Sequence, residues 1–296
     1  MELDPIPPGH RSGYVALVGR PNAGKSTLLN ALVGRKLSIV THKPQTTRHR
    51  VLGLLSEDGY QVVLLDTPGL LEPRYGLQER MMATVQSTIA EADLLLFLAD
   101  STREPDESML KALGDRPAIL VLTKIDLLSQ DQVLPRAEAF AKLYPFEEII
   151  PISAAKSFNL ERLVELVIAR MPLGPPYYPK DQVSEQPERF FVSEIIREKI
   201  FEVFRQEVPY ATAVNIVAYQ EREAPDKDLI DAEIVVERPT QKGILIGKGG
   251  EALKKIGTYA RRDIEAFTGR PVFLRLFVKV RDDWRNRDTF LDAYGY

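Results

Sequence analysis

The octapeptide Gly19–Ser26 constrains this 296-residue chain more than any other stretch. It follows the apolar run Tyr14–Val18, precedes the helical-looking Thr27–Val33 and matches the pattern G-x-x-x-x-G-K-S. Glycines at its first and sixth positions let the backbone curl, so that successive N–H groups can point at phosphate oxygens. The pattern therefore predicts a phosphate-binding loop between a strand and a helix.

Each residue type in this loop has a predicted role toward a phosphate chain. Lys25 can reach the outer phosphates, and the hydroxyl of Ser26 can ligate Mg2+. The helix that begins after the glycines adds the positive end of its dipole. The nucleotide contacts predicted in this stretch are Gly19, Asn22, Ala23, Gly24, Lys25, Ser26 and Thr27.

A second candidate loop, Asp66–Gly69, follows the apolar strand expected at Tyr60–Leu65. Asp66 can orient Mg2+ through a water, and the N–H of Gly69 can bond a γ-phosphate, which only the triphosphate has. Loss of that phosphate would release the loop, so the stretch is a candidate switch. Thr67, within it, is a further predicted nucleotide contact.

The stretch Thr123–Asp126, which follows a predicted strand, has residues suited to recognising a nucleotide base. A carboxylate at Asp126 can accept both the N1–H and the exocyclic amine of guanine, a donor pair that adenine lacks. The aliphatic stem of Lys124 can lie over the ring, and the N–H of Ala154 can bond the guanine O6. A helix N-cap role for Asp126 is the alternative. The base contacts predicted are Thr123, Lys124, Asp126, Ser153, Ala154 and Ala155.

The order of predicted elements indicates two domains. Strands alternate with helices through residues 1–172, which predicts an α/β domain with a mainly parallel sheet and helices on both faces. The Pro-rich stretch 173–187 is typical of a semi-rigid linker. Residues 188–296 then predict an α+β domain of helix, two strands, a glycine-rich loop that opens a helix, and a last strand.

The glycine-rich loop of the second domain is Gly-Lys-Gly-Gly, residues 247–250. A G-x-x-G loop between helices brings backbone N–H groups and a basic side chain close to a nucleic-acid backbone. Residues 238–296 carry a balance of +6, although the whole chain carries −3; on charge alone this is more typical of a solvated basic face. The helix and two strands before the loop and the helix and strand after it, together with this charge, favour RNA binding over an ordinary turn. The RNA-binding candidates are Gly247, Lys248, Gly249, Gly250, Lys254, Lys255 and Arg261.

The sequence also predicts a cytoplasmic location. No apolar run approaches the ~20 residues needed to cross a bilayer, and Met1–His10 lacks the basic and apolar regions of a signal peptide. There are no cysteines, which excludes disulfides and thiolate metal sites. The three histidines lack metal-ligand spacing and are expected to be solvated loop residues, and Trp284 is expected to pack in the core rather than to stack on a base.

Taken together, these loops resemble those of the bacterial Era family of GTPases, and the likeness extends over nearly the whole chain. Two further stretches carry it, Gln45–His49 and Ser193–Lys199. The resemblance implies a P-loop GTPase domain followed by a type II K homology (KH) domain. It also implies an enzyme that hydrolyses GTP to GDP and phosphate with Mg2+ and binds the 3′ end of small-subunit (16S) ribosomal RNA.

Further expectations come only from this resemblance. They are assistance to 30S subunit assembly, a monomeric state and a peripheral place on the cell membrane. The threonines of the Gln-Thr-Thr-Arg stretch form the first switch of the family, which puts Thr46 or Thr47 on Mg2+, and related GTPases favour Thr47. The implied catalytic set is Lys25, Thr47 and Gly69, and the implied Mg2+ set is Ser26, Thr47 and Asp66.

Two departures from the pattern affect the expected mechanism. Thr123 stands where the family usually has Asn, so one hydrogen bond near the guanine N7 and the phosphate loop is expected to be lost. Leu70 stands where Ras-like enzymes carry a water-positioning glutamine, which predicts slow intrinsic turnover that a partner or a K+ ion held by Asn22 would raise. The alternatives are an RNA-binding scaffold with little turnover, an ATP-dependent enzyme and a membrane-surface protein.

Overall fold

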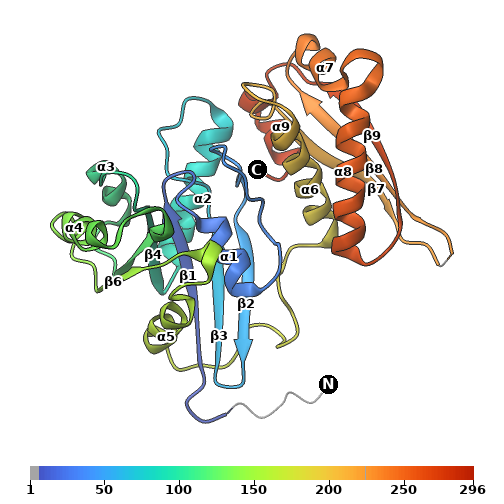
Figure 1. Cartoon of the computed structure of the whole chain (residues 1–296). Helices are drawn as coiled ribbons and strands as arrows, with labels where there is room; N and C mark the ends of the chain where they lie inside the picture. Colours follow the sequence, from blue (N-terminus) through green and yellow to red (C-terminus); the bar gives the residue numbers. More distant parts are fainter. Residues whose placement is uncertain (1–6, 224) are drawn as a thin grey trace. The chain divides into compact units, whose positions relative to one another are not determined.

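The computed structural model describes residues 7–223 and 225–296, which form two compact units (Figure 1). Residues 1–6, part of the stretch behind the prediction of a cytoplasmic location, lie outside the described residues. The first unit contains residues 7–38, 47–72 and 81–185. The second contains residues 186–296 together with two short segments from earlier in the chain, 39–46 and 73–80.

A six-stranded sheet forms the centre of the first unit, with strand order β2-β3-β1-β4-β5-β6. All neighbours are parallel except β2 and β3, which form the antiparallel hairpin that the turn at Glu57–Gly59 predicts. The strands are β1 (Arg11–Gly19), β2 (Val51–Glu57), β3 (Tyr60–Asp66), β4 (Leu94–Asp100), β5 (Ala118–Thr123) and β6 (Glu148–Pro151). The predicted mainly parallel α/β sheet is confirmed.

Helices cover both faces of this sheet because the central strands are apolar on both sides. Ala16 and Val18 of β1 share a core with Val85, Leu110 and Phe140 from the helices on one face. In Figure 1, α1 and α5 lie on the other face. The helices are α1 (Lys25–Val33), α2 (Gly76–Glu91), α3 (Glu107–Leu110), α4 (Gln130–Ala141) and α5 (Leu160–Arg170).

The first part of the Pro-rich stretch is held against the first unit. The side chain of Gln61 accepts hydrogen bonds from the N–H groups of Tyr177 (2.7 Å) and Tyr178 (2.9 Å) and donates one to the carbonyl of Tyr178 (2.8 Å). Further along, the N–H of Leu54 in β2 donates to the carbonyl of Val183 at 3.0 Å. Residues up to 185 are therefore tied to the β2–β3 hairpin, whereas composition alone indicated a linker over 173–187.

The second unit has the element order expected of a type II KH domain. Its sheet has the order β7-β8-β9, antiparallel between β7 and β8 and parallel between β8 and β9. The apolar faces of α6, α7 and α8 pack with alternate residues of β8 into one core. The elements are α6 (Glu188–Val203), β7 (Ala213–Gln220), β8 (Asp228–Val236), α7 (Pro239–Ile246), α8 (Glu251–Thr268), β9 (Val272–Val280) and α9 (Asp288–Ala293).

Two side chains show how local context decides burial. Trp284 is fully buried and its Nε1 donates to the carbonyl of Ala211 at 3.0 Å, which confirms the predicted core role. His10 was expected to be solvated, and this is wrong: the ring is buried, with Nδ1 2.9 Å from the carbonyl oxygen of Gly174. Within the described part of the chain, no helix has the length and apolar character needed to span a membrane.

Candidate functional site

The loop between β1 and α1 has the backbone conformation that its glycines predict. Gly19 has φ +151°, and a Cβ there would lie 2.3 Å from the carbonyl oxygen of Leu98, so a larger residue does not fit. Gly24 has φ +94° and is the N-cap of α1, whose first turn contains Lys25, Ser26 and Thr27. The loop therefore presents the start of a helix, where free N–H groups and the dipole attract anions.

Lys25 is buried inside this loop. Its Nζ donates to the carbonyl oxygens of Gly19 (3.0 Å) and Arg20 (2.9 Å). Burial lowers the pKa of Lys25 to about 8, and attraction to Asp66 opposes this only in part. An ammonium group that has already lost its water is stabilised by an anion at close range. A phosphate chain above the loop would provide that anion.

Three predicted metal-binding residues converge next to Lys25. The hydroxyl of Ser26 donates to Asp66 Oδ2 at 2.7 Å, and Thr47 Oγ1 lies 2.9 Å from Ser26 Oγ and 3.5 Å from Asp66 Oδ2. Asp66 is fully buried, and among the described residues its Oδ1 has no hydrogen-bond partner. Burial raises the pKa of Asp66, although Lys25 and the nearby hydroxyls oppose the shift.

This oxygen set suits Mg2+, which prefers carboxylate, hydroxyl and phosphate oxygens. The unpartnered Oδ1 of Asp66 is a buried acceptor that a cation or its water would satisfy. Bound there, Mg2+ would neutralise charge on the phosphates. Between the two threonines of the first switch, Thr47 faces this cluster, whereas the Thr46 hydroxyl donates to the carbonyl of Lys43 at 2.8 Å.

The second candidate loop packs directly on the first. A Cβ on Gly69 would lie 2.5 Å from the backbone nitrogen of Pro21, so this position requires glycine. The N–H of Leu70 donates to the carbonyl of Gly19 at 3.0 Å, and the Leu70 side chain is buried. The hydroxyl of Thr67 donates to the carbonyl of Leu17 at 2.7 Å. The nucleotide contact of Thr67 stays a prediction and would use its backbone N–H.

The contacts of Thr123 correct part of what its replacement of Asn predicts, the loss of a hydrogen bond to the phosphate loop. Its hydroxyl is buried and lies 2.8 Å from the carbonyl oxygen of Ala23 and 3.1 Å from that of Ala99. The tie between this loop and the phosphate loop, which was expected to be lost without Asn, is thus present. A hydroxyl has one proton, and both neighbouring atoms are acceptors, so none remains for a base nitrogen.

The remaining base-recognition residues lie where β5 and β6 end. Lys124 has φ +60°, and its Nζ pairs with Asp100 Oδ2 at 2.7 Å, which holds the side chain in place. Asp126 follows in an exposed turn, as the proposed acceptor of guanine requires. The Ser153 hydroxyl accepts from the N–H of Lys156 at 3.2 Å and shapes the turn that begins with Ala154 and Ala155.

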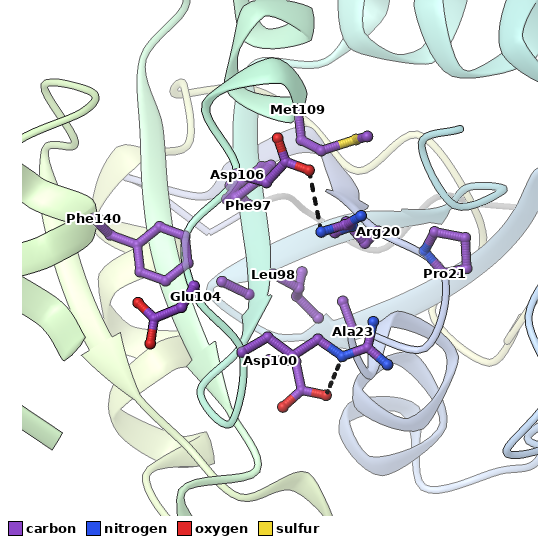
Figure 2. A pocket seen from close by; sticks show the side chains of 12 residues that line it. Arg20, Pro21, Ala23, Phe97, Leu98, Asp100, Glu104, Asp106, Met109 and Phe140 are labelled. Carbon is purple, nitrogen blue, oxygen red and sulfur yellow. Dashed lines mark ion pairs between the residues drawn. The ribbon is translucent and has the colours of Figure 1, made fainter. Parts of the chain in front are cut away.

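Behind the phosphate loop lies a small hollow that Figure 2 shows in close-up. Its volume is about 30 Å³, and Phe97, Met109 and Phe140 form apolar walls. At its rim, Arg20 Nη1 pairs with Asp106 Oδ2 at 3.1 Å. Because Lys25 and Ser26 do not line it, this hollow is not the predicted phosphate site.

The glycine-rich loop of the second unit leads into α8. Gly249 and Gly250 have φ +60° and +83°, and a Cβ on Gly247 would lie 2.8 Å from that of Ala252. Lys248 is exposed, as are three predicted RNA-binding cations on α8: Lys254, Lys255 and Arg261. These cations are therefore accessible to a nucleic-acid backbone.

Sequence reasoning missed two exposed residues on the helices that flank this loop. Tyr259 of α8 is exposed, with Lys255 Nζ 5.8 Å and Arg262 Cζ 6.0 Å from its ring centroid. Ile244 of α7 is 53% exposed, although it belongs to an apolar run. Exposed aromatic and aliphatic groups beside cations suit unstacked bases. The i, i+3 and i, i+4 spacing of Tyr259 to the cations on α8 was the available signal.

Two family models match separate parts of the chain. A family model described as "50S ribosome-binding GTPase" matches residues 14–124, and a KH domain model matches residues 207–285. The chain is 47% identical over 295 residues to "GTPase ERA1, chloroplastic" of Zea mays, covering 97% of this chain and 71% of that protein. It is 48% identical to "GTPase ERA-like, chloroplastic" of Arabidopsis thaliana, covering 97% and 69%.

Two solved structures match over nearly the full length. One is Era in complex with MgGDPNP and nucleotides 1506–1542 of 16S ribosomal RNA, at 41% identity and a TM-score of 0.93, covering 97% of this chain and 99% of that one. The other is a tyrosine-to-alanine variant of Aquifex aeolicus Era bound to GDP.AlF4−, at 42% identity and a TM-score of 0.92, with the same coverage. With its Mg2+-compatible nucleotide site and its KH unit, the chain belongs to the Era family of GTPases.

Proposed function

We propose that this GTPase binds the 3′ end of small-subunit ribosomal RNA through its KH unit and that the bound guanine nucleotide governs this binding. The observation that carries the proposal is the glycine-rich loop at 247–250, with Lys248 exposed, followed by α8, on which exposed cations pack against the exposed Tyr259. The related Era in complex with nucleotides 1506–1542 of 16S ribosomal RNA supports the choice of RNA. Assistance to 30S subunit assembly follows as the biological role.

We assign the nucleotide contacts as follows. The N–H groups of the phosphate loop and Lys25 hold the phosphates, and Gly69 bonds the terminal one. Ser26, Thr47 and Asp66 hold Mg2+ or its waters, which their mutual distances of 2.7 to 3.5 Å support. Asp126 and the turn that begins with Ala154 recognise guanine.

Hydrolysis in this site needs help in orienting the attacking water. The side chain at position 70 is a buried leucine, which has no hydrogen-bonding group to offer. We propose slow intrinsic turnover that K+ raises, with Asn22 in the phosphate loop as a ligand of the ion. Single-turnover rates in matched K+ and Na+ buffers test this, and equal rates would contradict it.

The proposed location is the cytoplasm, with peripheral contact to the inner face of the membrane. The exposed cations of α8 would provide that contact through anionic lipid headgroups. Sedimentation with liposomes that contain an anionic lipid, in the presence and absence of competing RNA, measures it. Binding only to neutral liposomes would contradict a role of these cations.

The RNA assignment is tested by crosslinking the full chain to cellular RNA and mapping the bound nucleotides. The proposal predicts crosslinks at the 3′ end of the small-subunit RNA, and crosslinks spread evenly over other RNAs would contradict it. A second candidate is a scaffold that binds RNA and nucleotide but turns over little GTP. Hydrolysis that Lys25→Ala abolishes would exclude the scaffold.

A further inference from the structure

The ends of β4 and β5 lie next to each other within the first unit, and each leads into a loop. The two strands are parallel neighbours, with Asp100 opposite Thr123 in the register. The N–H of Ser101 donates to the carbonyl of Thr123 at 3.1 Å, so the contact continues to the last residue of β5. Asp100, at the end of β4, therefore stands beside Lys124, the first residue after β5.

The two carboxylate oxygens of Asp100 have different partners. Its Oδ2 accepts from Lys124 Nζ at 2.7 Å, and its Oδ1 accepts from the hydroxyl and the N–H of Thr102 at 2.6 and 3.1 Å. Burial favours the neutral acid, but these hydrogen bonds outweigh it and hold the pKa of Asp100 below its usual range. Arg103 Nε is 3.8 Å from the same Oδ2, so Lys124 is the closer of these two cations.

The backbone of Lys124 has φ +60°, in the left-handed region that residues other than glycine seldom adopt. From there the chain enters a tight turn, in which the N–H of Leu127 donates to the carbonyl of Lys124 at 3.0 Å. This turn contains Asp126. Because the side chain and the backbone of Lys124 share one Cα, the ion pair to Asp100 disfavours backbone conformations that would carry the ammonium group away.

The same ion pair orders the Lys124 side chain before any base is bound. A lysine side chain that is free in water samples many rotamers, and ordering it on binding costs free energy. Here the ammonium group is held by a side chain that is only 9% exposed, while the Lys124 side chain is 35% exposed. A ligand that meets an already ordered side chain loses less free energy on binding.

We infer that Asp100 is a positioning residue for guanine recognition: it holds the ammonium group of Lys124, so that the aliphatic stem is already placed to lie over the ring. The inference rests on the proposed roles of Lys124 and Asp126 toward the base. Asp100 itself needs no contact with the nucleotide. Because a stacked stem contacts the ring face, Asp100 strengthens binding without reading the exocyclic amine of guanine.

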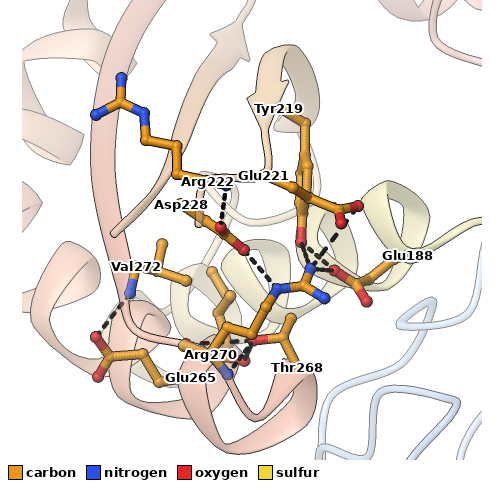
Figure 3. A network of polar contacts seen from close by, with 10 residues as sticks. Glu188, Tyr219, Glu221, Arg222, Asp228, Glu265, Thr268, Arg270 and Val272 are labelled. Carbon is orange, nitrogen blue, oxygen red and sulfur yellow. Dashed lines mark hydrogen bonds and ion pairs between the residues drawn. The ribbon is translucent and has the colours of Figure 1, made fainter. Parts of the chain in front are cut away.

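A matched control exists in the second unit, at the start of β8. Asp228 Oδ2 accepts from Arg270 Nε at 2.6 Å, and Asp228 Oδ1 accepts from the N–H of Arg222 at 2.9 Å, as Figure 3 shows. This buried carboxylate thus binds one basic side chain and one backbone N–H, as Asp100 does. The sequence predicts no nucleotide contact for any of these three residues. Asp228→Asn therefore measures the general effect of removing such a pair.

The experiment measures GDP binding by calorimetry in the full-length parent and in Asp100→Asn. Asparagine keeps one oxygen for Thr102, but its NH2 group then faces the Lys124 ammonium, and two donors cannot pair. GDP affinity is expected to fall about fivefold, the upper range for a partly exposed ion pair. Inosine diphosphate, which lacks the exocyclic amine, should lose affinity by the same factor.

A double-mutant cycle tests whether Asp100 acts through Lys124. Lys124→Met keeps an unbranched apolar stem but has no ammonium group for Asp100 to hold. Adding Asp100→Asn to Lys124→Met should then change GDP affinity by less than about twofold. A general role in the stability of the loop would instead give the same fivefold loss in both backgrounds. Asp228→Asn should leave GDP affinity within about twofold of the parent.

Unchanged GDP affinity in Asp100→Asn would overturn the inference, as would a loss that adds in full to that of Lys124→Met. A similar loss in Asp228→Asn would also overturn it, because general loosening would then explain both variants. A loss with GDP but not with inosine diphosphate would contradict an action through stacking. Failure of the underlying assignment is distinguishable: if Asp126→Ala leaves the preference for GDP over ADP unaltered, Asp126 does not read the base.

Discussion

At the scale of single residues, Thr123 keeps one of the contacts expected of the Asn that the family usually has at this position. The expected loss of the contact to the phosphate loop does not occur, because a hydroxyl reaches the Ala23 carbonyl as an amide would. Removing the Thr123 hydroxyl should show how much it supports the phosphate loop and how much it stabilises the core.

Thr123→Val replaces the hydroxyl with a methyl group of similar volume. The one hydrogen bond that the hydroxyl shares between the buried carbonyls of Ala23 and Ala99 is lost, at a cost of about 1–3 kcal/mol. We expect GDP affinity by calorimetry to fall about tenfold, because the carbonyl of Ala23 belongs to the phosphate loop. Thr88→Val removes another buried hydroxyl, bonded to a helix carbonyl at 2.7 Å, and should leave GDP affinity unchanged.

Lys25 predicts a dependence of nucleotide binding on pH. Burial lowers the pKa of Lys25 to about 8 in the free site, and bound phosphates should raise that pKa. A group whose pKa rises on binding takes up a proton, so affinity is fully present below about pH 8 and falls above it, by up to about tenfold per pH unit.

The measurement is calorimetry of GDP binding at pH 8 in two buffers with different ionisation enthalpies. Proton uptake of about half a proton per nucleotide is expected when the free group is half ionised. Lys25→Arg should abolish this uptake, since arginine stays charged throughout. Uptake that persists in Lys25→Arg would assign the proton to a different group.

The lack of space for a side chain at Gly69 leads to a prediction for the variant Gly69→Ala. A Cβ there would lie 2.5 Å from the Pro21 nitrogen, so Gly69→Ala must push the two loops apart. Single-turnover GTP hydrolysis should fall by at least about tenfold, because the N–H can no longer reach a terminal phosphate. GDP affinity should change by less than about threefold. Gly174→Ala, where nothing lies within 4 Å of the added Cβ, is the control.

At the scale of elements, the α7–α8 turn and α8 make a testable surface. Lys248→Ala removes one exposed cation from the glycine-rich loop without touching its positive-φ glycines. Affinity for single-stranded RNA should fall at all sequences, and the slope of log affinity against log salt should drop by about 0.7. Lys227→Ala removes a second exposed cation of the same unit, outside this loop, and should leave the slope unaltered. Equal slopes in all three proteins would contradict the assignment.

Most elements could be predicted because their signals are local. The apolar runs of β1, β4 and β5 are bounded by glycine, aspartate and threonine loops, and α8 repeats its apolar residues at helical spacing. α6 was predicted as a helix, but its middle turns also bury Glu194, Arg197, Glu198 and Lys199. Charged residues normally mark a solvated face, and only long-range partners such as the Thr46 carbonyl explain their burial.

At the scale of the whole molecule, the sequence predicted which modules are present but not which segments join which unit. Segments 39–46 and 73–80 belong with the second unit through contacts such as the N–H of Gly76 with Asn286 Oδ1 at 3.0 Å. Arg80 pairs with Asp288 at 3.0 Å in the same unit. These partners are more than 200 residues apart, and no periodicity or motif encodes such pairings.

The first of these segments ends just before Thr47, the proposed Mg2+ ligand, and the second begins a few residues after Gly69, the proposed γ-phosphate contact. The contacts of the segments lie in the second unit, whereas Thr47 and Gly69 lie in the first. On the proposed function, a nucleotide-dependent change at either residue would reach the second unit along the chain. The account thus requires that the terminal phosphate alters how the KH unit binds RNA.

The most direct test is the affinity of the full-length protein for a single-stranded 16S 3′-end RNA, measured with saturating GDP and with saturating GDPNP, both with Mg2+. The account predicts that the two dissociation constants differ by at least about fivefold, the lower end of typical coupling energies. Identical dissociation constants in the two nucleotide states would contradict it.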